Sequence, residues 1–310
     1  MKQTREMRRF LSWLAIVVCL LGSLAFAADP PPKRSKSDRD INAIGHRRLF
    51  DQKAIWYTVA REQEVGDKTS AAYEQSTPLV LDAAAIGYVD GVLQRLAKNS
   101  DAEMPVSVHI VNRDDMEAFT IAGGHLYLTR GLILHLQNEG ELASVLARGV
   151  AHTALRSSVR LQTGAMLLKL SDIPFLYIGQ NGPNIPPASL GNANARLAIL
   201  KFQRAEELDA DYFGVQYLYK SGYDTGCFLS TIQATAPVDT PGSALLSPLP
   251  PLSDRIEALQ KEISEILPRQ AGSIVSTLAF TEFQEHLRAM APPKPPETDS
   301  PKLLRQVPAQ

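Results

Sequence analysis

Two predicted helices each carry a pair of polar residues four positions apart, and this feature constrains the fold more than any other. One helical stretch reads LASVLARGVAHTALR and contains Arg148 and His152. A second stretch, 195–221, contains Glu207 and Asp211. Residues four apart lie on the same face of a helix. Each pair therefore presents both of its side chains in one direction.

The hydrophobic pattern predicts a mainly helical protein with a small antiparallel sheet, which is an α+β fold. The predicted helices are 78–98, 131–137, 139–156, 195–221 and 254–267. The predicted strands are 105–111, 118–121 and 125–129, the last two joined in a hairpin across Gly123-Gly124. The apolar stretch 167–178 contains Lys169, Asp172 and Pro174, which favour a buried or groove-covering helix over a membrane span.

Both ends of the chain differ in character from the middle. Residues 1–27 combine basic residues, an apolar run and an Ala25-Phe26-Ala27 site, as a cleaved signal peptide does. An uncleaved membrane anchor is the alternative, because the run is almost long enough to span a bilayer. The polar segment 28–40 is predicted to be a flexible linker, and 291–310 a Pro-rich disordered tail. One domain, 41–290, remains.

Charge and cysteine content argue against a nucleic-acid-binding protein and against a protein stabilised by internal disulfides. Four basic residues and one acidic residue lie in 1–27, so the rest of a chain of net charge −1 carries about −4. No basic stripe with interleaved aromatic residues indicates nucleic-acid binding. Cys19 lies in the signal, so a mature chain would keep only Cys227 and could form no internal disulfide. Cys227 is expected to be a buried small side chain rather than a nucleophile.

The first helical pair falls where a zinc-protease signature would lie. The HExxH motif needs His, Glu and His at its first, second and fifth positions. Those positions hold Arg148, Gly149 and His152. The helix therefore keeps the spacing of the motif and lacks two of its three functional residues.

An ordered series of short motifs surrounds this helix and resembles the HtpX/BepA-like zinc metallopeptidases. These are relatives of the CAAX prenyl protease and form family forty-eight of the metallopeptidases. The motifs are Ile44-Gly45-His46-Arg47, Ala118-Phe119 with Gly123-Gly124, 127–132, 142–152, 207–214, Gly222-Tyr223-Asp224 and Pro250-Pro251 with Arg255-Ile256. The likeness covers 41–290 and implies a zincin-like fold with the hairpin beside the motif helix.

The resemblance also implies roles for the motif positions. In the family, both HExxH histidines and the glutamate of a later ExxxD motif bind zinc, and the HExxH glutamate is the general base. Here His152 and Glu207 stand at two ligand positions and Arg148 at the third. Asp211 stands at the position whose carboxylate orients a ligand histidine. Gly149 stands at the position of the base. Further departures are Glu117, Ala122 and Leu249, where relatives often have asparagine, proline and histidine.

These substitutions predict that no catalytic zinc is held and that no catalytic residue remains. A guanidinium stays protonated and offers only donors, so Arg148 cannot be a ligand. Loss of the base at Gly149 removes a contribution of roughly 100- to 10,000-fold. We expect Arg148 to bridge Glu207 and Asp211 in place of the metal. The alternative is that Arg148 reaches solvent and the carboxylates are hydrated.

The remaining histidines are expected to be structural. His152 is predicted to hydrogen-bond Glu207. His109, on the polar side of its strand, and His125 are expected to be ordinary side chains rather than ligands. The same holds for His46, His135 and His286.

Three functions remain open on these grounds. The first is an exported pseudopeptidase, periplasmic or extracellular, that binds extended or misfolded polypeptides as a chaperone or adaptor. Its peptide-groove candidates are Ala118, Phe119, Gly123 and Gly124, by strand addition to the hairpin. Such a protein would be associated with a membrane only if the signal is uncleaved. The second is an active zinc metalloendopeptidase using non-motif ligands such as His109 or His125. The third is a structural envelope domain.

Overall fold

The computed structural model describes residues 34–50, 55–167, 176–178, 193–236 and 247–290. The described residues belong to one compact unit. The predicted signal peptide and Pro-rich tail lie outside the described residues. None of the described helices is both long and apolar enough to cross a membrane.

Helices dominate the described residues, and one short sheet lies among them. The helices are η1 (Ile41–Ala43), α2 (Val59–Glu74), α3 (Ala83–Lys98), α4 (Arg130–His135), α5 (Glu139–Ala154), α6 (Ser157–Leu167), α7 (Ala193–Lys220), α8 (Gly226–Ala234), α10 (Leu252–Glu265) and α11 (Leu278–Ala289). The strands are β1 (Ser107–Val111), β2 (Ala118–Ile121), β3 (His125–Thr129) and β4 (Leu176–Ile178). The α+β class is confirmed.

The sheet is mixed rather than purely antiparallel. Its strand order is β1-β3-β2-β4. The expected hairpin is present, with β2 antiparallel to β3 and Phe119 opposite Tyr127. However, β1 pairs with β3 in parallel, with Val108 opposite Leu126. The prediction of an antiparallel sheet is therefore wrong for β1, because the direction of its pairing depends on a partner distant in the sequence.

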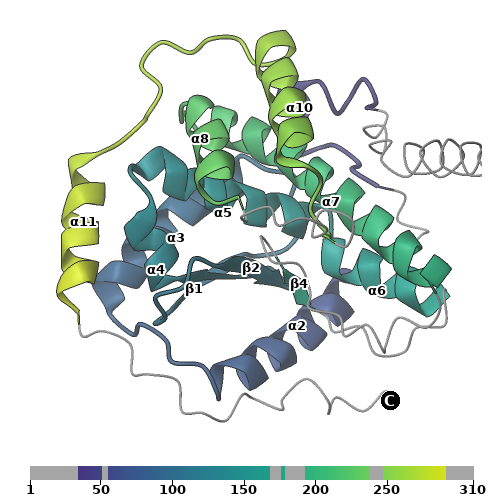
Figure 1. The fold of residues 1–310 in the computed structure, drawn as a ribbon, viewed down its shortest axis with the longest axis horizontal. Helices are drawn as coiled ribbons and strands as arrows, with labels where there is room; N and C mark the ends of the chain where they lie inside the picture. The colour runs from purple at the N-terminus through teal and green to yellow at the C-terminus, as the bar shows by residue number, and fades with distance from the viewer. Residues whose placement is uncertain (1–33, 51–54, 168–175, 179–192, 237–246, 291–310) are drawn as a thin grey trace, which may run out of the picture. The chain divides into compact units, whose positions relative to one another are not determined.

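The sheet lies between two layers of helices (Figure 1). α5 and α3 contact one face, through β2 and β1, while α2 contacts β2 and β3 from the other side. α5 packs in turn against α7 and α8. Because α5 is enclosed on all sides, nearly every one of its residues is buried. The side chain of Asn138 caps its first turn by accepting a hydrogen bond from the Glu141 amide.

Two segments differ from the sequence-based expectation. Part of the predicted linker is packed: Arg34 forms an ion pair with Asp209 at 2.6 Å and lies over the Tyr212 ring. The packed structure therefore begins before residue 41, because α7 offers both a carboxylate and an aromatic face to the arginine. In the apolar stretch 167–178, Leu176–Ile178 forms a strand on β2 instead of continuing a helix. Residues 168–175 lie outside the described part.

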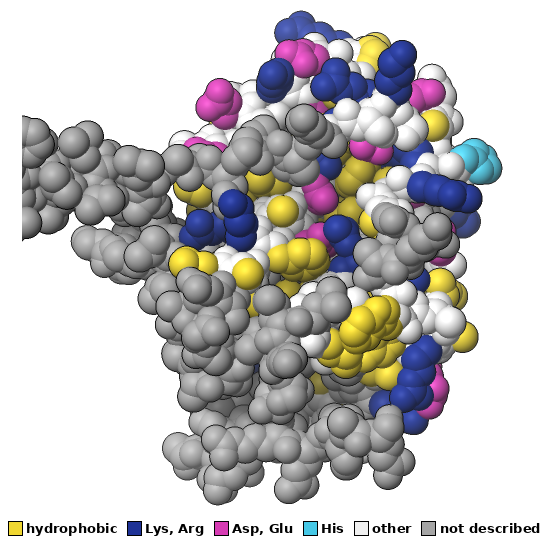
Figure 2. Space-filling view, turned by 90° about the vertical axis from the view of Figure 1, so that its right-hand side faces the viewer, with side chains coloured by type: hydrophobic (Ala, Val, Ile, Leu, Met, Phe, Trp, Pro, Cys, Tyr) yellow, Lys and Arg dark blue, Asp and Glu magenta, His cyan; other side chains and the backbone are white. Residues whose placement is uncertain are grey.

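Charged side chains of both signs are interspersed on the face drawn in Figure 2. Lys and Arg side chains stand beside Asp and Glu side chains, with hydrophobic side chains exposed between them. On the drawn, described part of this face, the charge pattern does not form a basic stripe of the kind that contacts a nucleic-acid backbone.

The contact between α2 and the hairpin turn gives a stability prediction. A Cβ built on Gly66 would lie 2.0 Å from the Ala122 carbonyl oxygen, so either the helix or the turn would have to move. We expect Gly66→Ala to lower the free energy of unfolding by about 2–3 kcal/mol, because backbone atoms cannot rotate away. Gly91→Ala is the matched control: no atom lies within 4 Å of its added Cβ, and alanine favours a helix interior. Urea denaturation of both variants measures the difference, and equal effects would contradict the assigned contact.

Candidate functional site

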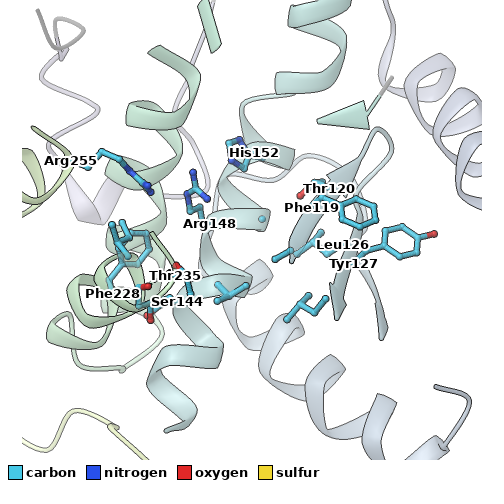
Figure 3. A pocket seen from close by; sticks show the side chains of 16 residues that line it. Phe119, Thr120, Leu126, Tyr127, Ser144, Arg148, His152, Phe228, Thr235 and Arg255 are labelled. Carbon is cyan, nitrogen blue, oxygen red and sulfur yellow. Dashed lines mark hydrogen bonds between the residues drawn. The ribbon is translucent and has the colours of Figure 1, made fainter. Parts of the chain in front are cut away.

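The four residues of the two helical pairs meet between α5 and α7. Arg148 and His152 lie on one face of α5, and Glu207 and Asp211 face them from α7. Figure 3 shows the Arg148 side chain between His152 and Arg255, with the strands of the hairpin on the other side of α5. Helix spacing puts each pair on one face of its helix, and the family resemblance indicated that the two pairs belong to one site.

Arg148 contacts both carboxylates of α7. Its Nε donates to Asp211 Oδ1 at 3.0 Å, and its Nη2 forms an ion pair with Glu207 Oε2. The Arg148 side chain is 12% exposed, and the carboxylates are 3% exposed. The structure thus has the bridge expected from the sequence, in place of an arginine extended into solvent.

A second arginine completes the cluster. Arg255 on α10 donates from Nε and Nη2 to the two oxygens of Asp211, at 2.6 and 2.9 Å. The cluster therefore contains two guanidinium groups and two carboxylates, with no net charge. Arg255 itself belongs to the motif series, together with Pro250-Pro251, but nothing in that motif assigned it a contact with Asp211. The available signal for a second cation was that two buried carboxylates, Glu207 and Asp211, face a single arginine, Arg148.

The two arginines determine the ionisation state of Asp211. Burial alone would raise the pKa of Asp211, but the charges and hydrogen bonds of Arg255 and Arg148 outweigh it, so the pKa lies below its ordinary value. Asp211 therefore stabilises the fold above the pKa of its unfolded form, about 3.9, and loses this contribution as pH falls through the folded value.

His152 is held as a neutral imidazole. Burial, with Arg148 and Arg255 nearby, lowers the pKa of His152 well below its ordinary value. Its Nε2 lies 3.9 Å from Glu207 Oε2, the oxygen that Arg148 also contacts, and its Nδ1 lies 3.4 Å from Ser157 Oγ. The first distance is an ion-pair separation, longer than a hydrogen bond between these two atoms.

The space next to Gly149 is filled by the sheet. A Cβ at Gly149 would lie 2.4 Å from Leu126 Cδ2 and 2.9 Å from Leu126 Cγ. Leu126 is 2% exposed and belongs to the core. Glycine therefore allows α5 to approach β3 closely, and any side chain at this position, including a catalytic glutamate, would require Leu126 to move.

A buried carboxyl next to the cluster gives a pH prediction. Glu206 accepts a hydrogen bond from Ser157 Oγ at 2.8 Å and pairs with Arg160 at 2.9 Å. Burial raises the pKa of Glu206 from 4.5 to about 7, although Arg160 acts against the rise. Between these values the folded state holds a proton that the unfolded chain releases. Stability attributable to Glu206 therefore falls as pH rises from about 4.5 to 7 and is constant above that.

We expect Glu206→Gln to flatten this part of the stability profile, since glutamine does not titrate. Relative to the wild type, the variant should gain up to about 3 kcal/mol between pH 5 and 8. Glu64→Gln is the control: Lys68 and Arg61 lower the pKa of the exposed Glu64 to about 2, so it stays ionised throughout this range. Urea midpoints at pH 5, 6, 7 and 8 test this, and parallel curves for the wild type and Glu206→Gln would contradict it.

A cavity of about 40 Å³ opens beside Arg148 and Gly149. It is lined by α5, α8, α10 and the strands β2 and β3, as Figure 3 shows. Apolar groups come from Leu128, Val145, Phe228 and Ile232, and hydroxyl groups from Ser144, Thr231 and Thr235. A cavity of this volume holds about three water molecules or a small side chain, and its lining favours an uncharged or apolar group.

The peptide-groove candidates are only partly brought to this cavity. Ala118 lines it and is half-exposed. Phe119 also borders it, but its ring stacks on Tyr127 with centroids 5.0 Å apart and points away from Arg148 (Figure 3). Gly123 and Gly124 are buried at the hairpin turn, against Gln63 and Pro105, and do not line the cavity. These two glycines shape the turn, where both have φ above 80°, rather than the cavity.

His109 and His125 lie on the other face of the sheet. His109 Nδ1 lies 3.0 Å from Glu74, and His125 Nε2 lies 2.9 Å from Asp67, both on α2. Neither histidine lines the cavity beside Arg148. In their described positions they supply no ligand to the motif helix.

Cys227 is buried, as predicted. A Cβ on Gly140 would lie 2.5 Å from its sulfur, so the thiol fills a gap between α5 and α8. Burial, Asp224 and Glu141 raise the pKa of Cys227 to about 11. A protonated, enclosed thiol is a packing group and not a nucleophile.

Within the described residues, no group of three or more His, Cys, Asp or Glu side chains is placed to hold a metal ion. At the motif positions His152 and Glu207 supply two such groups, and Arg148 supplies a cation. Zinc in a catalytic site is held by three protein ligands. The residues present do not fit a zinc ion.

A helix pair carrying the motif positions, set against a small mixed sheet, is the arrangement of a zincin-like metallopeptidase. The sequence matches Peptidase family M48 over residues 84–263, and the chain belongs to this family of zinc-dependent metallopeptidases.

Several relatives are known by name. The chain is similar to the beta-barrel assembly-enhancing protease of Yersinia pestis, with 28% identity over 70% of this chain and 46% of that protein. The Escherichia coli K12 protein of the same name is 27% identical over 54% of this chain and 36% of its own length. The mitochondrial metalloendopeptidase OMA1 of Schizosaccharomyces pombe is 26% identical over 58% of this chain and 52% of its own. The chain spans about half or less of the length of these relatives.

Proposed function

We propose that this protein is a pseudopeptidase, a family member that holds no catalytic zinc and binds extended or misfolded polypeptides. The observation that carries the proposal is the position of Arg148, whose guanidinium contacts Glu207 and Asp211 together. A divalent cation in contact with the same carboxylates would lie beside this positive charge. At about 4 Å and an effective dielectric constant of about 20, the repulsion is roughly 8 kcal/mol.

A second requirement of peptide hydrolysis, the general base, is also missing from its motif position. With Gly149 at the position of the general base, no carboxylate from this position can take a proton from an attacking water. Leu126 occupies the adjoining volume, so a mobile side chain from elsewhere would have to displace it. Loss of a ligand and loss of the base are independent changes, and both oppose an active peptidase.

The cavity supports a binding role. Its apolar and hydroxyl-lined walls need no metal to accept an apolar side chain of a polypeptide. The backbone of the client would lie along β2, next to Ala118. The names of the bacterial relatives refer to a protease that enhances beta-barrel assembly. An envelope chaperone or adaptor, exported to the periplasm or the extracellular space, is consistent with those names and with the predicted signal peptide. A signal left uncleaved would add membrane association.

A binding and cleavage assay with fluorescent casein, a disordered polypeptide, tests the proposal. We expect the wild type to bind casein without cutting it, and Ala118→Trp to weaken binding at least ~10-fold by filling the cavity mouth, a change of ~1.4 kcal/mol. Ala258→Trp places the same side chain on the exposed side of α10 and should bind as the wild type does. Casein fragments that disappear with a chelator would establish the alternative, an active metalloendopeptidase. Absence of both binding and cleavage would favour a structural domain.

A further inference from the structure

The strand that borders the cavity already has a partner on each side. β3 pairs with one edge of β2, and β4 pairs antiparallel with the other. The second pairing sets Phe119 opposite Ile178, Thr120 opposite Tyr177 and Ile121 opposite Leu176. The outer edge of β2 is therefore occupied by the chain itself.

This edge is the one that an extended polypeptide would need. Ala118, Phe119 and Thr120 of β2 all line the cavity, so a strand added to β2 would lie beside it. Strand addition uses the unpaired N–H and C=O groups at a sheet edge, and each edge accepts one strand. A polypeptide and Leu176–Ile178 therefore compete for the same backbone groups.

We propose that β4 is an internal competitor of the client, and that a polypeptide binds along β2 only in molecules from which β4 has detached. This inference rests on the proposed function and adds its regulation. β4 has three residues, whereas strands usually have five or six, so its pairing involves few backbone groups. The measured dissociation constant is then the intrinsic one divided by the fraction of molecules with β4 detached.

A polypeptide bound at either of two other edges of the sheet would respond differently to changes in β4. The outer side of β1 already has a bridge between Leu79 and Val111, on the strand farthest from β4. The outer side of β4 lies one strand further from β2, at a spacing of about 4.8 Å. A client bound at either edge would not be weakened by fixing β4 in place, and a client on β4 itself would be lost if β4 detached.

A disulfide between β2 and β4 tests the proposal in one direction. Ile121 and Leu176 are opposite each other, and antiparallel neighbours lie within the Cα separation that a disulfide spans. Ile121 is fully buried and does not line the cavity. In the full-length Ile121→Cys/Leu176→Cys variant, we expect oxidation to weaken casein binding at least ~10-fold and reduction to restore it, which corresponds to ~1.4 kcal/mol. The two single-cysteine variants, oxidised and reduced in the same way, are the controls.

Proline substitutions test the opposite direction. Leu176→Pro/Tyr177→Pro/Ile178→Pro removes every N–H donor of β4, so it cannot pair with β2. We expect tighter casein binding than in the wild type, by a factor equal to the inverse of the detached fraction. Tighter binding here, with loss of binding in the oxidised double-cysteine variant, supports the proposal.

The outcomes separate this inference from the proposed function. If the wild type binds casein and neither the disulfide nor the prolines change the affinity, β4 is no competitor, while the proposed function stands. If the prolines abolish binding, the client binds on β4 and the inference is wrong. If neither the wild type nor any variant binds casein, the proposed function itself fails. Mapping of the disulfide by peptide mass spectrometry ensures that the oxidised variant is locked.

Discussion

Replacing Asp211 with alanine is expected to destabilise this protein more than any other single substitution in the site. Asp211 accepts three hydrogen bonds from Arg148 and Arg255 and is almost fully buried. Its removal leaves Glu207 as the one carboxylate of the cluster for two guanidinium groups. Breaking a buried ion pair in this way costs about 3–5 kcal/mol. The melting temperature should fall by about 6–20 °C, measured by differential scanning calorimetry.

Glu64→Ala is the control for this loss. Glu64 pairs with Arg61 and Lys68 at 2.8 Å each, but all three side chains are about half exposed or more. Pairs of this kind contribute about 0–1 kcal/mol because solvent screens them. If Asp211→Ala costs no more than Glu64→Ala, the cluster does not hold α5, α7 and α10 together as described.

Replacing Arg148 with histidine is expected to create a zinc site. The new imidazole would join His152 and Glu207, giving the two histidines and one glutamate found in known catalytic zinc sites. Asp211 is already placed to accept a hydrogen bond from this position, as it now does from Arg148. We expect one zinc ion per chain in isothermal titration calorimetry. At a free zinc concentration of about 100 times the dissociation constant, the fold should gain about 2.7 kcal/mol.

Arg148→Met is the matched control, because it removes the cation and adds no ligand. Zinc binding by the methionine variant would show that charge removal alone is sufficient, and failure of the histidine variant to bind zinc would contradict the assigned ligand geometry.

Adding Gly149→Glu to Arg148→His should not by itself restore peptidase activity, since the new Cβ meets Leu126. That addition should cost about 1–3 kcal/mol, and Leu126→Ala should relieve part of the strain.

The local elements could be predicted because their signals are local. Both hairpin strands have the predicted bounds, and α5 follows the predicted helix to within a turn. By contrast, the sequence of α2 has no apolar periodicity that predicts a helix. Its buried face consists of Glu62, Gly66 and Ser70, which read as polar or small residues in the sequence. Glu62 is buried because Arg156 pairs with it at 2.6 Å, and that partner lies far along the chain.

Interactions between distant segments limited the prediction of the site in the same way. Spacing and family resemblance placed Arg148 with Glu207 and Asp211, because each pair shares one helix face. They could not show that Leu126 fills the volume beside Gly149, which depends on how closely α5 approaches β3. They also could not show that Leu176–Ile178 pairs with β2, since an apolar stretch fits a helix or a strand until its partner is known.

The zinc content of the purified wild-type protein tests the central claim most directly. The claim is that the Arg148 guanidinium, paired with Glu207 and Asp211, replaces the metal. Plasma mass spectrometry of protein produced with ample zinc, with Arg148→His prepared in parallel, gives the number of zinc ions per chain. We expect no stoichiometric zinc in the wild type and one zinc per chain in the variant. One tightly held zinc per wild-type chain, lost with a chelator together with casein cleavage, would contradict the claim.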